Sequence, residues 1–257
     1  MDEPVGPWVD SHCHLFLIER EPSAVLTDAA TVGVSWVMCP GIDLETSLAA
    51  RRIAGEHPDR VLWSAGLHPH DASRWQDEGA RIAALAPDAA AIGECGLDYY
   101  RDLTPRDTQR SVFQEQVNLA RDLDKPIIVH TRDSFADVHE ILSVADLGEK
   151  AVLHCWTGGP RWTKRFLELG ATFSFAGPIT YATGDTVRRA AALVPPDRAL
   201  IETDSPYLAP EPYRGENNRP ALVPRNGAAL AGVWDVEVAA VAAHTAANAA
   251  RVFGSPR

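Results

Sequence analysis

The sequence predicts an α/β fold, a single (β/α)8 or TIM barrel with a metal site at the carboxyl ends of its strands. Short apolar segments that suit strands alternate with helical segments along the whole chain, and histidine or acidic residues stand at or just after the ends of most apolar segments. Eight such strand–helix units at short spacing indicate a parallel sheet, and eight parallel strands can close into a barrel.

The eight strands are predicted from short apolar runs, which suit strands that are buried on both faces. They are expected at residues 8–16, 34–39, 61–66, 89–93, 126–129, 151–153, 171–175 and 199–201. Pro7 and the segment 19–22 bound the first strand. Side chains alternate along it, so Asp10, His12 and His14 should share one face, with the two imidazoles about 7 Å apart along the backbone.

Helices are predicted from alanine-rich or periodic segments between the strands. They are expected at residues 44–56, 73–85, 105–123, from 135 onward, and at 162–169, 185–193 and 236–253. Thr104 is the expected cap of the third helix, with Pro105 at its first position. Ser134 and Asp137 resemble a capping box. Residues 205–225 have no regular pattern and are too long for a plain connector, which suggests a functional role.

Composition favours one domain over residues 1–257, because 46% apolar residues can supply a large core. The first ten residues lack the apolar run of a signal peptide, and no stretch reaches the ~18–20 apolar residues of a membrane span. A cytoplasmic protein with reduced cysteines, no membrane contact and no obligate protein partner is expected. The net charge of −11 argues against a broad basic surface, although bound cations can still create a local positive site.

Six side chains with metal-binding chemistry lie near predicted strand ends: His12, His14, Glu94, His130, His154 and Asp204. In a barrel such residues converge on one mouth. A catalytic cation usually takes three protein ligands and water, so six ligands predict two divalent ions. We expect one ion on the first two histidines and Asp204, the other on the last two histidines, and Glu94 as the bridge. Mg, Mn, Zn, Co and Ni all remain possible ions.

The expected chemistry is hydrolysis by a hydroxide that the two ions hold at neutral pH. Asp204 is the expected general base, which accepts the proton of the nucleophile and then helps to protonate the leaving group. With Glu94 and Asp204 as the only carboxylates, two dications and a hydroxide leave about one positive charge. This charge favours an anionic substrate such as a phosphodiester over a neutral amide, without forbidding the amide.

Three further residues are expected to contact substrate: His68, Arg132 and Arg214. His68 ends a predicted strand, where it would contact phosphate or the bound water; a buried, hydrogen-bonded imidazole is the alternative. The chain has 21 arginines and three lysines, and arginine suits bidentate phosphate contacts, although genome composition also explains such a bias. Asp10 is expected either to orient His12 or to form a hydrogen bond at the barrel floor.

Several motifs together resemble the TatD family of metal-dependent deoxyribonucleases. They are Asp-Ser-His-Cys-His-Leu at 10–15, Gly-Leu-His-Pro-His at 66–70, Gly-Glu-Cys-Gly-Leu-Asp-Tyr at 93–99, Val-His-Thr-Arg at 129–132, Leu-His-Cys-Trp-Thr-Gly-Gly at 153–159 and Glu-Thr-Asp-Ser-Pro-Tyr-Leu-Ala-Pro at 202–210. The resemblance runs from about residue 8 to the carboxyl terminus. It implies a TIM barrel of the amidohydrolase superfamily that hydrolyses phosphodiester bonds, often as an exonuclease on DNA, through the same six ligands.

The resemblance also places Arg214 in a substrate-side loop, since residues 214–220 are similar to the family's loop after the last strand. Two positions depart from the family pattern. Phe16 directly follows the His-x-His-Leu motif, where an aspartate usually comes soon after, and Trp156 stands where phenylalanine is usual. Neither is a proposed ligand, so the metal site is unaffected, while the substrate preference near the mouth need not follow the family.

Two alternatives use the same barrel. The first is an amidohydrolase or lactonase, or an ester hydrolase that acts on aminoacyl-tRNA. Many amidohydrolases bridge their metals with a carbamylated lysine, but none of the three lysines ends a predicted strand. The second is a non-catalytic binder, which would be expected to have lost a ligand or Asp204. The sequence therefore predicts a two-metal hydrolase that acts on DNA, or on RNA or a small phosphodiester.

Overall fold

The chain forms the predicted eight-stranded parallel barrel in a computed structural model that describes residues 5–257. The strands pair in chain order, each with the next, and every pair is parallel. They are β1 (Trp8–Asp10), β2 (Val34–Pro40), β3 (Val61–Ala65), β4 (Ala91–Asp98), β5 (Ile127–Arg132), β6 (Ala151–Leu153), β7 (Thr172–Phe175) and β8 (Ala199–Ile201).

The barrel is closed by main-chain hydrogen bonds that join the end of β1 and the residues after it to the end of β8 and the residues after it. The N–H of Ser11 donates to the carbonyl of Ile201 at 3.0 Å, and the N–H of Asp204 donates to the carbonyl of His12 at 2.8 Å. Cys13 and Ser205 then form an isolated parallel bridge. Because this seam continues beyond the strands, it brings the His-x-His segment and Asp204 together by backbone pairing alone.

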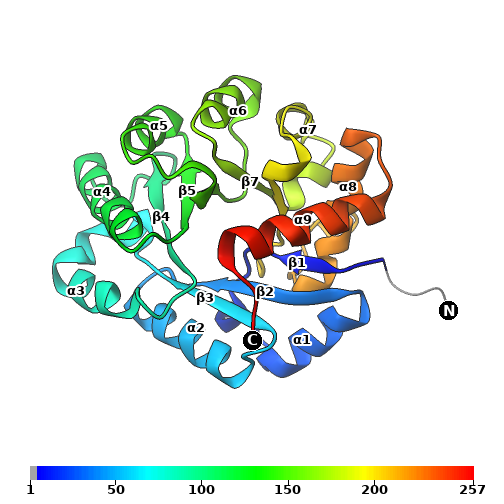
Figure 1. The fold of residues 1–257 in the computed structure, drawn as a ribbon, viewed down its shortest axis with the longest axis horizontal. Helices are drawn as coiled ribbons and strands as arrows, with labels where there is room; N and C mark the ends of the chain where they lie inside the picture. Colours follow the sequence, from blue (N-terminus) through cyan, green and yellow to red (C-terminus); the bar gives the residue numbers. More distant parts are fainter. Residues whose placement is uncertain (1–4) are drawn as a thin grey trace.

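Nine helices surround or cap the barrel within the described residues (Figure 1). They are α1 (Pro22–Thr31), α2 (Leu44–Glu56), α3 (Trp75–Leu85), α4 (Arg106–Asp122), α5 (Phe135–Ser143), α6 (Gly159–Glu168), α7 (Asp185–Ala191), α8 (Val223–Trp234) and α9 (Val238–Phe253). No helix in this part of the chain combines the length and the apolar character needed to cross a bilayer.

The buried apolar side chains form two groups. The larger group packs between the strands and the surrounding helices. The smaller group lies inside the barrel, where Trp36, Met38 and Ile128 pack with Val252 and Phe253 of α9. Figure 1 shows α9 lying across the ring of strands. This helix therefore covers one end of the barrel and leaves the carboxyl ends of the strands for the site.

The first strand is much shorter than predicted. β1 ends at Asp10, and after the bridge at Cys13 the chain forms a 3-10 helix, η1, over Leu15–Leu17. The apolar residues of this segment are therefore not an extension of the strand. A continuous strand over residues 8–16 was a wrong prediction, because beyond Asp10 the pairing is reduced to an isolated bridge and the chain then turns into a helix.

Two helices were not predicted. α1 begins at Pro22, a residue interpreted only as a strand boundary, and proline suits the first helical position. α8 begins inside the segment 205–225, which is irregular up to the 3-10 helix η6 (Pro220–Leu222). Two caps were also wrong. The hydroxyl of Thr104 donates to the carbonyl of His70, and that of Ser134 donates to the carbonyl of Leu97, so neither side chain caps its helix.

Candidate metal centre

The six predicted ligands come together at the carboxyl ends of the strands. His12 and His14 follow β1, Glu94 lies within β4, His130 lies in β5, and His154 and Asp204 follow β6 and β8. All six are buried or nearly so; the Asp204 side chain is 13% exposed and that of His130 19% exposed. A seventh residue, His68, follows β3 and joins the same cluster.

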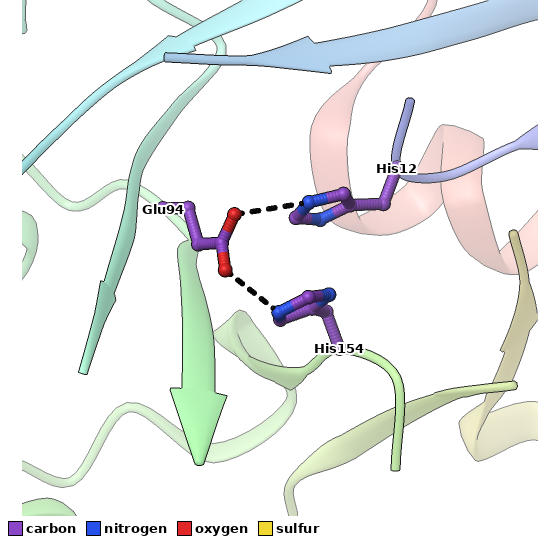
Figure 2. Close-up of side chains that lie close together, drawn as sticks. All are labelled: His12, Glu94 and His154. Atoms are coloured by element: carbon purple, nitrogen blue, oxygen red, sulfur yellow. Dashed lines mark ion pairs between the residues drawn. The ribbon is translucent and has the colours of Figure 1, made fainter. Parts of the chain in front are cut away.

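Glu94 is at the centre of the cluster, and its two oxygens face different histidines. Oε2 lies 3.2 Å from Nε2 of His12, and Oε1 lies 2.9 Å from Nε2 of His154 (Figure 2). Nδ1 of His130 and Nε2 of His68 also approach Oε1, at 3.1 Å and 3.4 Å. The nearby histidines hold the pKa of Glu94 well below its usual range, although burial alone would raise it. The ionised carboxylate therefore has one oxygen for each half of the cluster.

Asp204 completes the half of the cluster that contains the His-x-His pair. Its Oδ1 lies 3.5 Å from Nε2 of His14 and 3.7 Å from Nε2 of His12. Burial alone would raise the pKa of Asp204. The hydrogen bond with His14 and the charges of the neighbouring histidines lower it by more, so the net shift of the pKa is downward. Asp204 is therefore ionised near neutral pH and can accept a proton.

The nitrogen atoms are arranged as a cation would require. Nδ1 of His14 lies 3.3 Å from the carbonyl of Pro40, so a proton there leaves Nε2 with a lone pair. That Nε2 lies 3.3 Å from Nε2 of His12. Two imidazole nitrogens and two carboxylates directed at one small volume repel one another unless a positive charge lies between them. The donors are buried nitrogen and oxygen atoms, a set that suits Zn, Mn, Co or Ni.

The ligand atoms fall into three groups in which all members lie within 4.8 Å of one another: His12, His14 and Asp204; His12, Glu94 and His154; and His68, Glu94 and His130. Glu94 and His12 each belong to two of these groups. The residues present fit a divalent-metal centre.

A second set of carboxylates lies behind the histidines, and the sequence interpretation missed it. Oδ2 of Asp98 lies 3.2 Å from Nε2 of His130 and 2.9 Å from Nε2 of His70. Oε1 of Glu202 lies 3.4 Å from Nδ1 of His154. The hydrogen bond with Asp98 fixes which ring nitrogen of His130 is free for a metal, whereas Nδ1 of His154 has no hydrogen-bond partner within the described residues. Alternation along β4 could have identified Asp98, which lies four residues after Glu94 in the same strand.

Asp10 acts on the backbone of His12 and does not contact its ring. Its Oδ1 accepts hydrogen bonds from the N–H of Thr203 at 2.8 Å and from the N–H of His12 at 3.3 Å. Nδ1 of His12 has no hydrogen-bond partner within the described residues. Asp10 therefore ties the first ligand segment to the last one and does not orient the imidazole.

The three predicted substrate contacts differ in position. His68 lies within the metal cluster, and burial together with its histidine neighbours lowers its pKa to about 4, so it is neutral at pH 7. Arg132 and Arg214 are exposed and form no ion pair with the cluster among residues 5–257. Their guanidinium carbons lie over tyrosine rings instead, 3.9 Å from the centre of Tyr100 and 4.4 Å from the centre of Tyr181.

Comparison with known proteins gives a consistent result. A family model described as TatD related DNase matches residues 9–254. The uncharacterized metal-dependent hydrolase YcfH of Escherichia coli K12 is 39% identical over 254 residues, which cover 95% of both chains. The 3'-5' ssDNA/RNA exonuclease TatD of Citrobacter rodentium is 35% identical over 245 residues, which cover 91% of this chain and 92% of that protein.

The solved structures extend this likeness to three dimensions. The E. coli TatD homologue YjjV superimposes with a TM-score of 0.90 at 27% identity, covering 98% of this chain and all of the other. A β-aspartyl dipeptidase from Fervidobacterium islandicum has a TM-score of 0.64 at 15% identity, covering 98% of this chain and 76% of that one, and this shows only a shared fold.

Proposed function

Because the chain belongs to the TatD family of metal-dependent hydrolases, enzymes that act on ester bonds, we propose that it is a two-metal phosphodiesterase that shortens nucleic acid strands from an end. The observation that carries the proposal is the position of Glu94 between two sets of histidines, with Asp204 beside one of them. The relatives named as 3'-5' ssDNA/RNA exonucleases support DNA or RNA as the substrate and the 3' end as the starting point.

The metal ligands in this proposal are the six predicted residues. His12, His14 and Asp204 would hold one divalent ion, His130 and His154 would hold the other, and Glu94 would bridge them. Ions bound there would supply Lewis acidity toward the phosphoryl group and make water acidic enough to react near neutral pH.

Asp204 is the proposed general base. It is ionised at neutral pH, and its side chain is more exposed than that of Glu94, 13% against 4%. It can therefore accept the proton of an attacking water and pass it to the leaving oxygen. Glu94 has no comparable freedom, because both of its oxygens face histidines.

The structure changes the charge balance expected for the substrate site. Asp98 and Glu202 add two carboxylates behind the histidines. Two dications would then be cancelled by four carboxylates, and a hydroxide would leave the centre slightly negative. The preference for an anionic substrate must therefore come from the rim. Arg132 and Arg214 are the proposed source, since guanidinium groups suit phosphate.

The lysine-bridged amidohydrolase alternative is not favoured. Lys125 donates to the carbonyls of Pro87 and Ala89, and Lys150 pairs with Asp124 at 2.6 Å. The remaining lysine, Lys164, lies on helix α6. No lysine is therefore placed to bridge the ions, and Glu94 occupies the centre. The cytoplasmic location expected from the sequence stays a prediction.

The test is degradation of an end-labelled single-stranded oligonucleotide with Mg²⁺ or Mn²⁺ by the wild-type protein and by Asp204→Asn. We expect stepwise shortening by the wild type and a loss of at least about a hundredfold in the variant, the usual scale for general base catalysis. A parallel panel of a lactone, a dipeptide and an aminoacyl ester checks the alternatives. Equal nuclease activity of the two proteins, or hydrolysis confined to that panel, would contradict the proposal.

A further inference from the structure

All five tyrosines of the chain lie in the segments that follow β4, β7 and β8. Tyr99 and Tyr100 come directly after β4, Tyr181 comes after the 3-10 helix η4 (Gly177–Thr180) behind β7, and Tyr207 and Tyr213 lie between β8 and η6. These segments leave the carboxyl ends of the strands, where the metal cluster lies. The proposed metal chemistry uses none of these rings, so their concentration at the mouth needs another explanation.

Two of the five rings are open to solvent. Tyr100 is 61% exposed and Tyr207 is 55% exposed. The other three contact the protein: the hydroxyl of Tyr99 donates to Asp137 at 2.5 Å, that of Tyr181 donates to the carbonyl of Ala209 at 3.0 Å, and the guanidinium groups of Arg219 and Arg225 lie over the ring of Tyr213. Exposed aromatic faces beside a proposed substrate site are available for stacking.

The two exposed tyrosines are attached to opposite halves of the metal cluster. The ring of Tyr207 lies 6.4 Å from the ring of His14, and its N–H donates to the carbonyl of Asp204 at 2.9 Å. The N–H of Tyr100 donates to Oδ1 of Asp98 at 3.0 Å, and the other oxygen of Asp98 contacts His130. A ligand that spans both halves of the cluster would therefore reach the segments that carry Tyr100 and Tyr207.

Arginines accompany these rings in a chain that is otherwise acidic. The guanidinium of Arg132 lies over Tyr100, and that of Arg214 lies over Tyr181. The segment that carries Arg214 also carries Glu211 and Glu216, so the local positive charge is modest. Stacking, more than charge, should hold a ligand here, and a polyanion with flat aromatic groups matches both features.

We propose that Tyr100 and Tyr207 are stacking platforms for two unpaired nucleobases of a single-stranded nucleic acid that lies across the metal cluster, with Arg132 contacting its backbone. This inference rests on the proposed nuclease function and adds the residues that select unpaired strands. Bases inside a duplex have both faces covered by their neighbours, so they cannot stack on these rings.

The test compares Tyr100→Ala and Tyr207→Ala with the corresponding Phe variants, using a single-stranded substrate of defined length. Each alanine variant should raise KM about tenfold with little change in kcat, because base–aromatic stacking contributes mainly to binding. Each phenylalanine variant should behave like the wild type. Leu103→Ala is the matched control, since Leu103 is 66% exposed in the same segment as Tyr100.

Oligonucleotides that lack one base at successive positions complete a double-mutant cycle. At the position that stacks on a given tyrosine, base removal and the alanine substitution should each raise KM, and together they should raise it no further. A wild-type KM in both alanine variants, or fully additive effects at every position, would overturn the inference. A wild-type protein without any phosphodiesterase activity would instead contradict the proposed function. In that case, fluorescence anisotropy with the labelled strand would still measure how the tyrosine substitutions change binding.

Discussion

Oδ2 of Asp98 lies 3.2 Å from Nε2 of His130, so this imidazole has only Nδ1 left to face Glu94, at 3.1 Å. The other three histidines that were predicted as ligands direct Nε2 toward the centre. Asp98 therefore decides which nitrogen of His130 a metal would meet. The carboxylate is held in place by the N–H groups of Tyr100 and Arg101, which donate to Oδ1.

Asp98→Asn should weaken binding of one divalent ion by about 10–100-fold. The asparagine can still accept the main-chain hydrogen bonds through Oδ1, but its amide would face the Nε2 proton of His130 as a second donor. Titration with Mn²⁺ by calorimetry measures the affinity of each ion. Asp102→Asn, at an exposed aspartate of the same segment, should bind both ions as the wild type does. Unchanged binding in Asp98→Asn would show that Asp98 does not position the ligand.

Glu94→Gln should lower metal occupancy and activity together. One neutral amide replaces a carboxylate whose oxygens face His12 on one side and His154 on the other, so both halves of the cluster lose a charged ligand. Elemental analysis after gel filtration gives the number of bound ions per chain, and the nuclease assay gives the activity. Full occupancy by two ions in the variant would contradict the bridging role.

Asp10 should make the protein less stable as pH rises. Burial raises the pKa of Asp10 to about 8, although the hydrogen bonds from Thr203 oppose the shift. The unfolded chain has an ordinary aspartate pKa of about 3.9. Between about pH 4 and about pH 8, Asp10 is protonated in the folded state and ionised in the unfolded state. The contribution of Asp10 to the free energy of unfolding is therefore greatest below about pH 4 and declines as the pH rises to about 8.

Asp10→Asn removes this titration and should gain stability relative to the wild type as pH rises through the same window. Thermal unfolding in EDTA at several pH values measures the difference in Tm. Asp59→Asn, at an exposed aspartate, is the control and should show no pH-dependent difference. A constant difference between the wild type and Asp10→Asn across the window would show that Asp10 stays ionised in the fold.

Two glycines of α8 should respond in opposite ways to alanine. A Cβ on Gly227 would lie 2.2 Å from the ring of Trp8, which is fully buried, whereas a Cβ on Gly232 would meet nothing within 4 Å. Gly227→Ala should cost about 1–3 kcal/mol of unfolding free energy through overpacking. Gly232→Ala should gain about 0.5–1 kcal/mol, since alanine is the better helix residue. Urea denaturation measures both, and equal effects would show that the packing of Trp8 is looser than described.

Strand positions were predicted closely where a strand is a continuous apolar run. Residues 34–39, 151–153 and 199–201 correspond to β2, β6 and β8 within one residue. The prediction failed at residues 8–16 because alternation and apolar content do not record where pairing with β8 ends. The helices α1 and α8 were also missed. The start of α1, at Pro22, was interpreted as a strand boundary, and the start of α8, which has a proline at its second position, was interpreted as part of an irregular segment.

The sequence by itself determined that eight apolar strands alternate with helices and that ligand-type side chains follow their ends, because both features are local patterns in the chain. Only the tertiary structure decided that the two oxygens of Glu94 face opposite sets of histidines, that Asp98 and Glu202 lie behind those rings, and that the ring of Tyr207 lies beside that of His14. Such contacts depend on strand register and on the seam between Ser11 and Ile201, which join residues far apart in the sequence and leave no local pattern.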